Sequence, residues 1–347
     1  MATRMTLADL DLLPDDSPET GQTVAVLDAP RRIRCARARI PEPGPGQIRL
    51  RVTWVGICGS DLEAYRGSRQ PEFLSFPARL GHEVAGRIDR LGPGVTGLRE
   101  GQQVACRYVW GAFAEYIVCT PFNVIPVPED VPHQACSQIE VLPGILHAAD
   151  LARITPQSRV LIMGQGVSGL IMTQVVARHS PAVLAVSDLH EHKLELARRY
   201  GATHTYRLPA ADARTRAQTD ADHPDGFDVV IPCLLDGDGM VDAIDACSLG
   251  ARLIMYGCIG MCRKPLDFFV VHRKRLEILS TEPRRDIDMR RYFAESLRMV
   301  CDGTVDTLGT ITDHFPLGRI DEAFALRDAD RSGHIHVLVQ CSTEETA

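Results

Sequence analysis

A glycine-rich turn at residues 164–169 constrains the fold of this 347-residue chain more than any other feature. The turn has the pattern G-x-G-x-x-G and follows the apolar run 160–163, which is typical of a strand buried on both faces. A segment with helical character begins at about Ser168. A strand, a glycine turn and a helix in this order favour a dinucleotide site, because backbone N–H groups and the helix N-terminus bind pyrophosphate there. The turn therefore predicts a Rossmann-type sheet.

Strands and helices alternate through the region around this turn. Helical stretches separate the expected strands, which span residues 160–163, 183–187, 203–206, 227–231, 252–256 and 276–280. Six strands interleaved with helices form a doubly wound parallel sheet. The fold class expected here is α/β.

The N-terminal part of the chain has a β pattern. Proline and glycine turns separate its short expected strands, which begin at 24–27, 33–40 and 48–52. No helical periodicity of useful length precedes about Gln134, and the chain closes with an expected strand at 334–340.

This closing strand suits the β-rich first domain better than the completed Rossmann sheet. We therefore expect an N-terminal extension at 1–22, a first domain at 23–146, the Rossmann domain at 147–284, and a return to the first domain at 285–347.

Cys58 and the adjacent pair His82 and Glu83 occur in glycine-rich turns of the first domain. Thiolate, imidazole and carboxylate groups all bind zinc, and a site with three protein ligands leaves one position open. Zinc with an open position polarises a carbonyl or acidifies an alcohol. For an isolated cysteine, a buried thiol is the favoured interpretation of Cys58, and the alternative interpretation of His82 is a hydrogen-bonded core histidine. With a nucleotide turn in the same chain, the combination predicts alcohol–carbonyl interconversion.

The composition is that of a soluble globular protein, with 45% hydrophobic and 24% charged residues. The net charge of -7 does not favour a nucleic-acid partner. No apolar run reaches the ~20 residues that a membrane-spanning helix needs. The acidic N-terminus lacks the apolar region of a signal peptide. The eleven scattered cysteines indicate reduced thiols. We expect a cytoplasmic protein.

Asp188 lies at the end of the second Rossmann strand. A carboxylate at this position accepts the ribose hydroxyls of NAD and repels the 2′-phosphate of NADP. The sequence therefore predicts a preference for NAD(H).

Several segments together resemble the zinc-dependent medium-chain alcohol and polyol dehydrogenases. They are the stretches at 56–61, 81–86, 111–116, 164–169 and 272–274. The resemblance covers residues 23–340 and implies a GroES-like β-barrel catalytic domain, a Rossmann domain and an active site in the cleft between them. It also implies a small-molecule substrate and a homodimer or homotetramer.

The same resemblance implies roles for individual residues. Cys58 and His82 match the first two catalytic zinc ligands. Glu83 matches an adjacent acid that is a ligand in some members, and Asp61 a carboxylate that orients the histidine ligand. The residues that match cofactor-binding positions are Gly164, Gly166, Val167, Ser168, Gly169, Asp188 and Lys193.

Glu140 is a further candidate for the metal. The segment 138–142 resembles the sorbitol and threonine dehydrogenase branch, in which a glutamate meets the metal directly or through water. The alternative is an acid favoured by a helix N-terminus. The third ligand is therefore Glu83 or Glu140.

The chain departs from the family at two places. Only six residues separate Val104 from Gly111, where most zinc members have a lobe with four cysteines, so we expect a single, catalytic zinc. Glu63 stands where many members have a proton-relay histidine. Ser60 remains available as the hydroxyl that passes the substrate proton onward, and Trp110 and Tyr65 are aromatic residues that either line the site or only pack.

The sequence thus predicts an NAD-dependent zinc oxidoreductase that interconverts a secondary alcohol of a polyol, sugar or cyclitol with its ketone. Hydroxyl-rich substrates are favoured because carboxylates such as Glu63 and Glu140 hydrogen-bond them. The alternatives are an NAD(P)H-dependent ene-reductase of a cyclic enone, which the presence of Cys58, His82 and Glu83 disfavours, and a non-catalytic scaffold protein.

Overall fold

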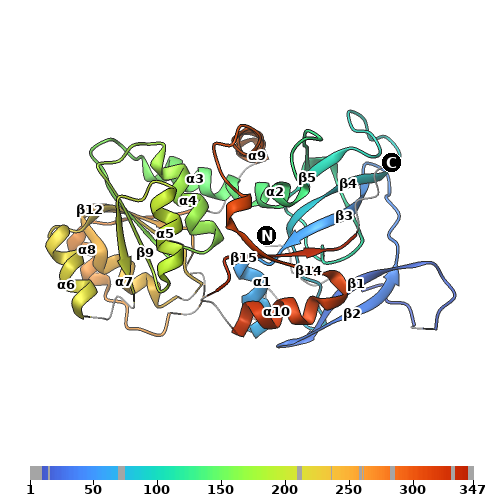
Figure 1. Ribbon diagram of the computed structural model, residues 1–347, viewed down its shortest axis with the longest axis horizontal. Helices are drawn as coiled ribbons and strands as arrows, with labels where there is room; N and C mark the ends of the chain where they lie inside the picture. The colour runs from blue at the N-terminus through green and yellow to red at the C-terminus, as the bar shows by residue number, and fades with distance from the viewer. Residues whose placement is uncertain are drawn as a thin grey trace. The chain divides into compact units, whose positions relative to one another are not determined.

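The chain forms two compact units in the computed structural model (Figure 1). The structure describes residues 10–14, 16–68, 75–208, 213–235, 237–257, 260, 262–281, 286–329 and 333–342. The first unit consists of Met1–Glu140, Leu297–Asp302 and Thr307–Ala347, and the second of Val141–Ser296 and Gly303–Asp306. The domain limits given above from the sequence stay predictions.

The second unit is built on a six-stranded parallel sheet with the order β10-β9-β8-β11-β12-β13. The strands are β8 (Arg159–Met163), β9 (Val183–Asp188), β10 (His204–Arg207), β11 (Phe227–Pro232), β12 (Cys247–Met255) and β13 (Glu277–Ser280). The strand order reverses at β8, which lies between β9 and β11. The predicted doubly wound parallel sheet is confirmed.

Helices connect these strands, as parallel pairing requires. Helix α3 (Leu142–Ala152) precedes β8, and the connecting helices are α4 (Val167–Ala177), α5 (Glu191–Arg199), α6 (Ala213–Asp222), α7 (Gly239–Ala246) and α8 (Phe268–Lys274). A further helix, α9 (Asp286–Cys301), has residues in both units. Leu161, Val230 and Leu253 bring β8, β11 and β12 together in a buried apolar cluster.

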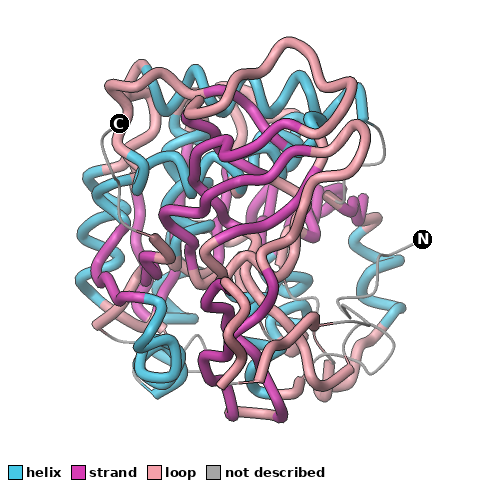
Figure 2. Tube along the Cα trace, turned by 90° about the vertical axis from the view of Figure 1, so that its right-hand side faces the viewer, coloured by secondary structure: helices cyan, strands magenta, loops and turns pink. Residues whose placement is uncertain are grey.

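The first unit is mainly antiparallel. Its larger sheet has the order β14-β15-β3-β4-β5-β7, with β6 on β3, and β1 and β2 form a separate hairpin. The strands are β1 (Gly21–Ala29), β2 (Arg32–Arg39), β3 (Ile48–Gly56), β4 (Glu83–Leu91), β5 (Gln103–Cys106), β6 (Tyr116–Cys119), β7 (Val124–Pro126), β14 (Ile311–Pro316) and β15 (His336–Gln340). Its helices are α1 (Gly59–Arg66), α2 (His133–Ser137) and α10 (Ile320–Ala329). Figure 2 shows the helices and strands along the Cα trace, coloured by type.

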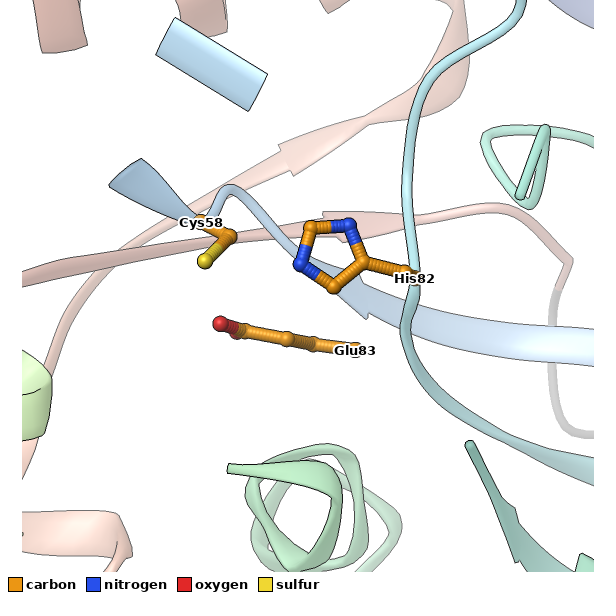
Figure 3. A group of neighbouring side chains, drawn as sticks. All are labelled: Cys58, His82 and Glu83. Carbon is orange, nitrogen blue, oxygen red and sulfur yellow. The ribbon is translucent and has the colours of Figure 1, made fainter. Parts of the chain in front are cut away.

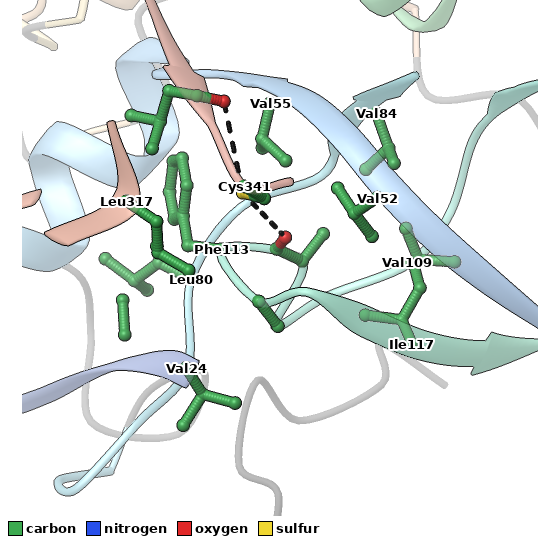
Figure 4. Packing of buried hydrophobic residues seen from close by; sticks show 14 of the residues in the cluster. Val24, Val52, Val55, Leu80, Val84, Val109, Phe113, Ile117, Leu317 and Cys341 are labelled. Carbon is green, nitrogen blue, oxygen red and sulfur yellow. Dashed lines mark hydrogen bonds between the residues drawn. The ribbon is translucent and has the colours of Figure 1, made fainter. Parts of the chain in front are cut away.

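The core of the first unit lies around Phe113 and Phe324, whose ring centroids are 5.6 Å apart. Figure 4 shows Phe113 among Val24, Val52 and Cys341, which come from segments far apart in the sequence. The Cys341 thiol lies 3.8 Å from the carbonyl oxygen of Ala112. Cys341 and Val52 thus join the C-terminal end of the chain to β3, which leads into the site described below.

Helix α1 and strand β14 are among the elements of the first unit that were not expected from the sequence. Helix α1 has only eight residues, too few for a clear periodic pattern. It begins after Cys58, whose N–H donates to the Asp61 carboxylate over 3.1 Å, and ends at Gly67 with a φ of 70°. Strand β14 pairs in parallel with β15. Local capping and long-range pairing, and not periodicity, define these two elements.

Replacing Asp328 with asparagine should lower the free energy of unfolding of the first unit by about 1–2 kcal/mol at pH 7. The Asp328 carboxylate accepts hydrogen bonds from Arg31 (2.7 Å) and Arg66 (2.5 Å), and so joins α10 to the β1–β2 turn and to α1. Burial raises the pKa of the Asp328 carboxyl, but the two guanidinium groups outweigh it and lower that pKa. Urea unfolding can be followed by tryptophan fluorescence, since Trp54 and Trp110 both belong to this unit.

The pH dependence of this variant follows from the lowered pKa. The stabilisation is present above the unfolded carboxyl pKa of about 4 and is lost as the pH falls through the lower folded value. The difference between the variant and the wild type should therefore shrink below about pH 4. Glu322→Gln on the same helix is the control, because its pair with Arg319 is exposed to solvent and should contribute little to stability. Equal effects of the two substitutions on the free energy of unfolding would show that the Asp328 carboxylate has no special stabilising role.

Candidate metal centre

Cys58, His82 and Glu83 come together where two paired strands meet. Cys58 follows the end of β3 and precedes α1, while Glu83 begins β4. Gly56 of β3 is the register partner of Glu83 in the antiparallel pair, so the two strand ends lie side by side. Figure 3 shows the three side chains converging on one space. Their ligand atoms all lie within 4.8 Å of one another, and this is the one such group of three found among the described residues.

This donor set fits zinc. Ligand bonds of about 2.0–2.3 Å in a tetrahedron place donor atoms roughly 3.3–3.8 Å apart, so small side-chain shifts suffice to close the group on an ion. Thiolate, imidazole and carboxylate are the usual zinc donors, and a fourth position stays available. The residues named from the sequence as metal ligands are thus brought together, with the exception of Glu140.

Asp61 and Ser60 lie on either side of the His82 ring. Asp61 Oδ1 is 3.5 Å from Nδ1, and Asp61 also accepts the N–H groups of Cys58 and Gly81. A carboxylate fixed beside Nδ1 favours the tautomer with the proton on Nδ1, which leaves the Nε2 lone pair for a metal. Ser60 Oγ is 3.3 Å from Nε2, so a hydroxyl lies beside the atom that would bind the ion.

The charged groups of the centre shift one another's pKa values. Burial lowers the pKa of His82, but Asp61 and Cys58 outweigh it and the pKa is raised well above its usual value. Burial raises the pKa of the Glu83 carboxyl, yet attraction to His336 and His82 lowers it overall. Burial and the Glu83 charge raise the pKa of the Cys58 thiol. A cation would stabilise both the thiolate and the carboxylate, since a coordinating thiol is deprotonated.

The sequence analysis did not assign a role to His336 or Gly56, which both help to position Glu83. His336 Nε2 is 3.1 Å from Glu83 Oε2, and both side chains are fully buried. A Cβ atom on Gly56 would lie closer than 3.0 Å to both of them. The absence of a side chain at Gly56 therefore makes room for the Glu83–His336 pair. The sequence signal was weak: a histidine in the closing strand and a glycine at the end of a β stretch.

Glu140 lies at the edge of the centre and outside the group of three. It ends a short 3-10 helix, Gln138–Glu140, and its Oε1 is 3.7 Å from Nε of Arg107. Burial raises the pKa of the Glu140 carboxyl, and attraction to His82 and Arg107 offsets part of this. Glu140 thus interacts electrostatically with the centre but is not one of the converging ligands.

The two aromatic residues named above have different places. The Trp110 ring packs on the His82 ring with centroids 4.4 Å apart, so Trp110 lines the metal centre. Tyr65 packs against Phe324 in the core at 5.0 Å. Glu63 is buried in α1 and does not belong to the group of converging ligands, so its role stays a prediction.

The glycine turn of the second unit joins β8 to α4. Gly164 has a φ of 89°, which favours glycine, and a Cβ on Gly169 would overlap the carbonyl oxygen of Gly164. A Cβ on Gly166 would meet no protein atom within 4 Å. Glycine at 164 and at 169 is thus needed for the turn to fold. The open space at Gly166 instead fits a dinucleotide that approaches the backbone closely.

The other predicted cofactor residues lie on nearby elements. Val167 and Ser168 start α4, so backbone N–H groups of a helix N-terminus follow Gly166. Asp188 ends β9 and accepts the N–H groups of Gln165 (2.7 Å) and His190 (3.0 Å). These bonds fix the carboxylate and leave it further lone pairs for a ribose. Lys193 is buried in α5, and its contact with a cofactor stays a prediction.

A Gly166→Ala variant should bind NADH at least about 10-fold more weakly, because the new methyl group fills the space that the pyrophosphate needs and overpacking costs about 1–3 kcal/mol. Folding should be unaffected, since Gly166 has an ordinary φ of -73° and open space around it. Fluorescence titration with NADH measures the change. Unchanged affinity with intact folding would show that no dinucleotide passes this backbone.

Two family comparisons match successive parts of the chain. Residues 44–129 match the alcohol dehydrogenase GroES-like domain, and residues 169–298 match the zinc-binding dehydrogenase family. The first match contains Cys58, His82 and Glu83. The chain belongs to the zinc-dependent medium-chain dehydrogenases. The predicted family and fold, a GroES-like domain with a Rossmann sheet, are confirmed, and zinc and a nicotinamide dinucleotide are the cofactors that its two sites fit.

Curated relatives align over most of their length. An L-threonine 3-dehydrogenase of Anaeromyxobacter dehalogenans is 26% identical over 325 residues, which cover 85% of this chain and 92% of the relative. A sorbitol dehydrogenase of Bacillus subtilis is 26% identical over 331 residues, covering 86% and 91%.

Solved structures share the fold. An alcohol dehydrogenase from E. coli CFT073, solved with NADH, superposes with a TM-score of 0.79 at 23% identity and covers 93% of this chain and 100% of its own. A zinc-binding dehydrogenase from Sinorhizobium meliloti 1021, bound to NADP, gives the same TM-score of 0.79 at 23% identity and the same coverage of 93% and 100%. Within the described part of the chain, no helix is both long and apolar enough to span a membrane.

Proposed function

We propose that this enzyme interconverts a secondary alcohol of a polyol, sugar or cyclitol with its ketone, using NAD(H). The observation that carries the proposal is the convergence of Cys58, His82 and Glu83, with the further acid Glu140 at its edge. Names of relatives agree with a hydroxyl-bearing substrate, since one is a sorbitol dehydrogenase and another an L-threonine 3-dehydrogenase. Carboxylates beside an open metal position suit several hydroxyl groups better than an apolar substrate.

The residues of the first unit would divide the work as follows. When bound, zinc supplies Lewis-acid polarisation of the substrate oxygen, and the nicotinamide exchanges the hydride. Cys58, His82 and Glu83 hold the ion, and Asp61 fixes the ring of His82. The Ser60 hydroxyl relays the proton: it accepts the proton of the substrate alcohol while its own proton passes to a second acceptor, and the same transfer runs backwards in the reverse direction. We propose Glu63 either as the next proton acceptor or as a hydrogen-bond partner of a substrate hydroxyl.

The preference for NAD rests on Asp188. Its carboxylate is fixed at the end of β9 by two backbone N–H groups, and it would repel a 2′-phosphate. Comparison of kcat/KM with NAD and NADP tests this part separately. Similar values for the two cofactors would contradict it.

The proposed function is tested by a dehydrogenase screen over polyols, cyclitols and simple alcohols, together with elemental analysis. We expect about one zinc per chain and the best kcat/KM on a compound with several hydroxyl groups. A zinc-free protein that reduces a cyclic enone would identify it as an ene-reductase. A protein that binds no NADH would indicate a non-catalytic role.

A further inference from the structure

The short segment that follows β5 places a cation beside the metal centre. Arg107 directly follows Cys106, its N–H donates to the Asn123 carbonyl oxygen over 2.8 Å, and Asn123 Nδ2 donates back to the Arg107 carbonyl oxygen over 3.0 Å. Tyr108 has a φ of 59°, so the chain turns sharply after Arg107. The guanidinium lies over the Tyr108 ring, 4.1 Å from its centroid. Arg107 is therefore held by its backbone on both sides and by an aromatic ring.

Arg107 and Glu140 form a shielded ion pair. Their side chains are 8% and 15% exposed, and Nε lies 3.7 Å from Oε1. A charge removed from water is costly unless an opposite charge compensates it, and removal of one partner from a buried pair leaves the other uncompensated. Movement of Glu140 away from Arg107 and onto an ion would thus weaken the compensation of the guanidinium.

The charges of the zinc and its anionic ligands balance when Glu140 stays with Arg107. The thiolate of Cys58 and the carboxylate of Glu83 together neutralise a divalent zinc, while Glu140 and Arg107 neutralise each other. A second carboxylate on the ion would make the zinc site anionic, occupy its fourth position and weaken its pull on a substrate oxygen. The geometry agrees, because Glu140 is not among the residues whose ligand atoms converge.

We propose that Arg107 is a positioning residue that holds Glu140 off the zinc and so keeps the fourth coordination position open for the substrate. This inference rests on the proposed function of the same site. It assigns a role to the segment between Val104 and Gly111, where the sequence lacks the cysteine-rich lobe. In this short segment, Trp110 packs on the His82 ring and Arg107 pairs with Glu140 at the edge of the centre.

The test uses the cobalt-substituted enzyme and imidazole as a probe of the open position. In Arg107→Met, Glu140 should move onto the metal, change the visible spectrum of the cobalt and weaken imidazole binding by about 10-fold or more. The double variant Arg107→Met/Glu140→Gln should regain the affinity of the wild type, and Arg107→Lys should retain most of it. Arg87→Met is the matched control, because Arg87 pairs with Glu129 in the same unit.

The results of these experiments either support or overturn the proposed role of Arg107. Wild-type imidazole affinity in Arg107→Met, or no recovery in the double variant, would overturn the proposal. If Arg107→Met does not fold, Glu140→Gln alone serves, with an unchanged cobalt spectrum expected; loss of the metal would identify Glu140 as a ligand and overturn the inference. A wild-type protein that takes up neither zinc nor cobalt would instead contradict the proposed function.

Discussion

A Cys58→Ala variant is expected to lose about 1,000-fold or more in kcat/KM and to retain less than a full equivalent of zinc. Removal of the thiolate leaves His82 and Glu83 as the converging ligands of the ion. Lewis-acid stabilisation of the transition state is worth several kcal/mol, and each 1.4 kcal/mol corresponds to about a factor of ten in rate. Steady-state kinetics and elemental analysis of the same preparation measure the two effects together.

Cys262→Ala is the matched control for the loss of a thiol, because Cys262 is exposed and lies in the second unit. It should keep the activity and zinc content of the wild type. NADH affinity should be unchanged in both variants, since the glycine turn at Gly164–Gly169 belongs to the second unit. Near-normal turnover by zinc-depleted Cys58→Ala would exclude a catalytic role for the metal.

The fold of the second unit could be predicted because its signals are local. Apolar runs such as 160–163 indicate buried parallel strands, and glycines at 164 and 169 are required where a side chain would be strained or would overlap the backbone. In the first unit, helix α1 was missed because one capping interaction defines it and no periodic pattern does. Strand β14 was missed because its extended conformation depends on pairing with β15, which the local sequence does not indicate.

The candidate ligands could also be named from the sequence, since Cys58, His82 and Glu83 occur in short glycine-rich stretches that resemble the family. Their charged neighbours could not. His336 reaches Glu83 only because β15 pairs with β3, and this register brings Leu338 opposite Gly56. Arg107 lies beside Glu140 because the chain turns at Tyr108, and the sequence did not predict this turn. Contacts between distant segments depend on strand register, which single residues do not encode.

Gly56→Ala is expected to weaken zinc affinity by about 10-fold or more, although Gly56 itself has no ligand atom. A Cβ at this position would lie closer than 3.0 Å to Glu83 Oε2 and His336 Nε2, so the carboxylate or the strand must move. Overpacking of this kind costs about 1–3 kcal/mol, which corresponds to roughly one to two orders of magnitude in a binding constant. Competition with a chromophoric chelator measures zinc affinity directly.

Gly318→Ala separates this effect from a general effect of the added methyl group. Gly318 lies in the same unit, a Cβ atom there would meet no protein atom within 4 Å, and the variant should bind zinc like the wild type. If Gly56→Ala folds and keeps wild-type zinc affinity, Glu83 has moved without loss to the metal and is not a ligand. Loss of affinity in Gly56→Ala alone is the result expected if Glu83 binds the ion, because the methyl group meets that carboxylate and has neither Cys58 nor His82 among its nearest contacts.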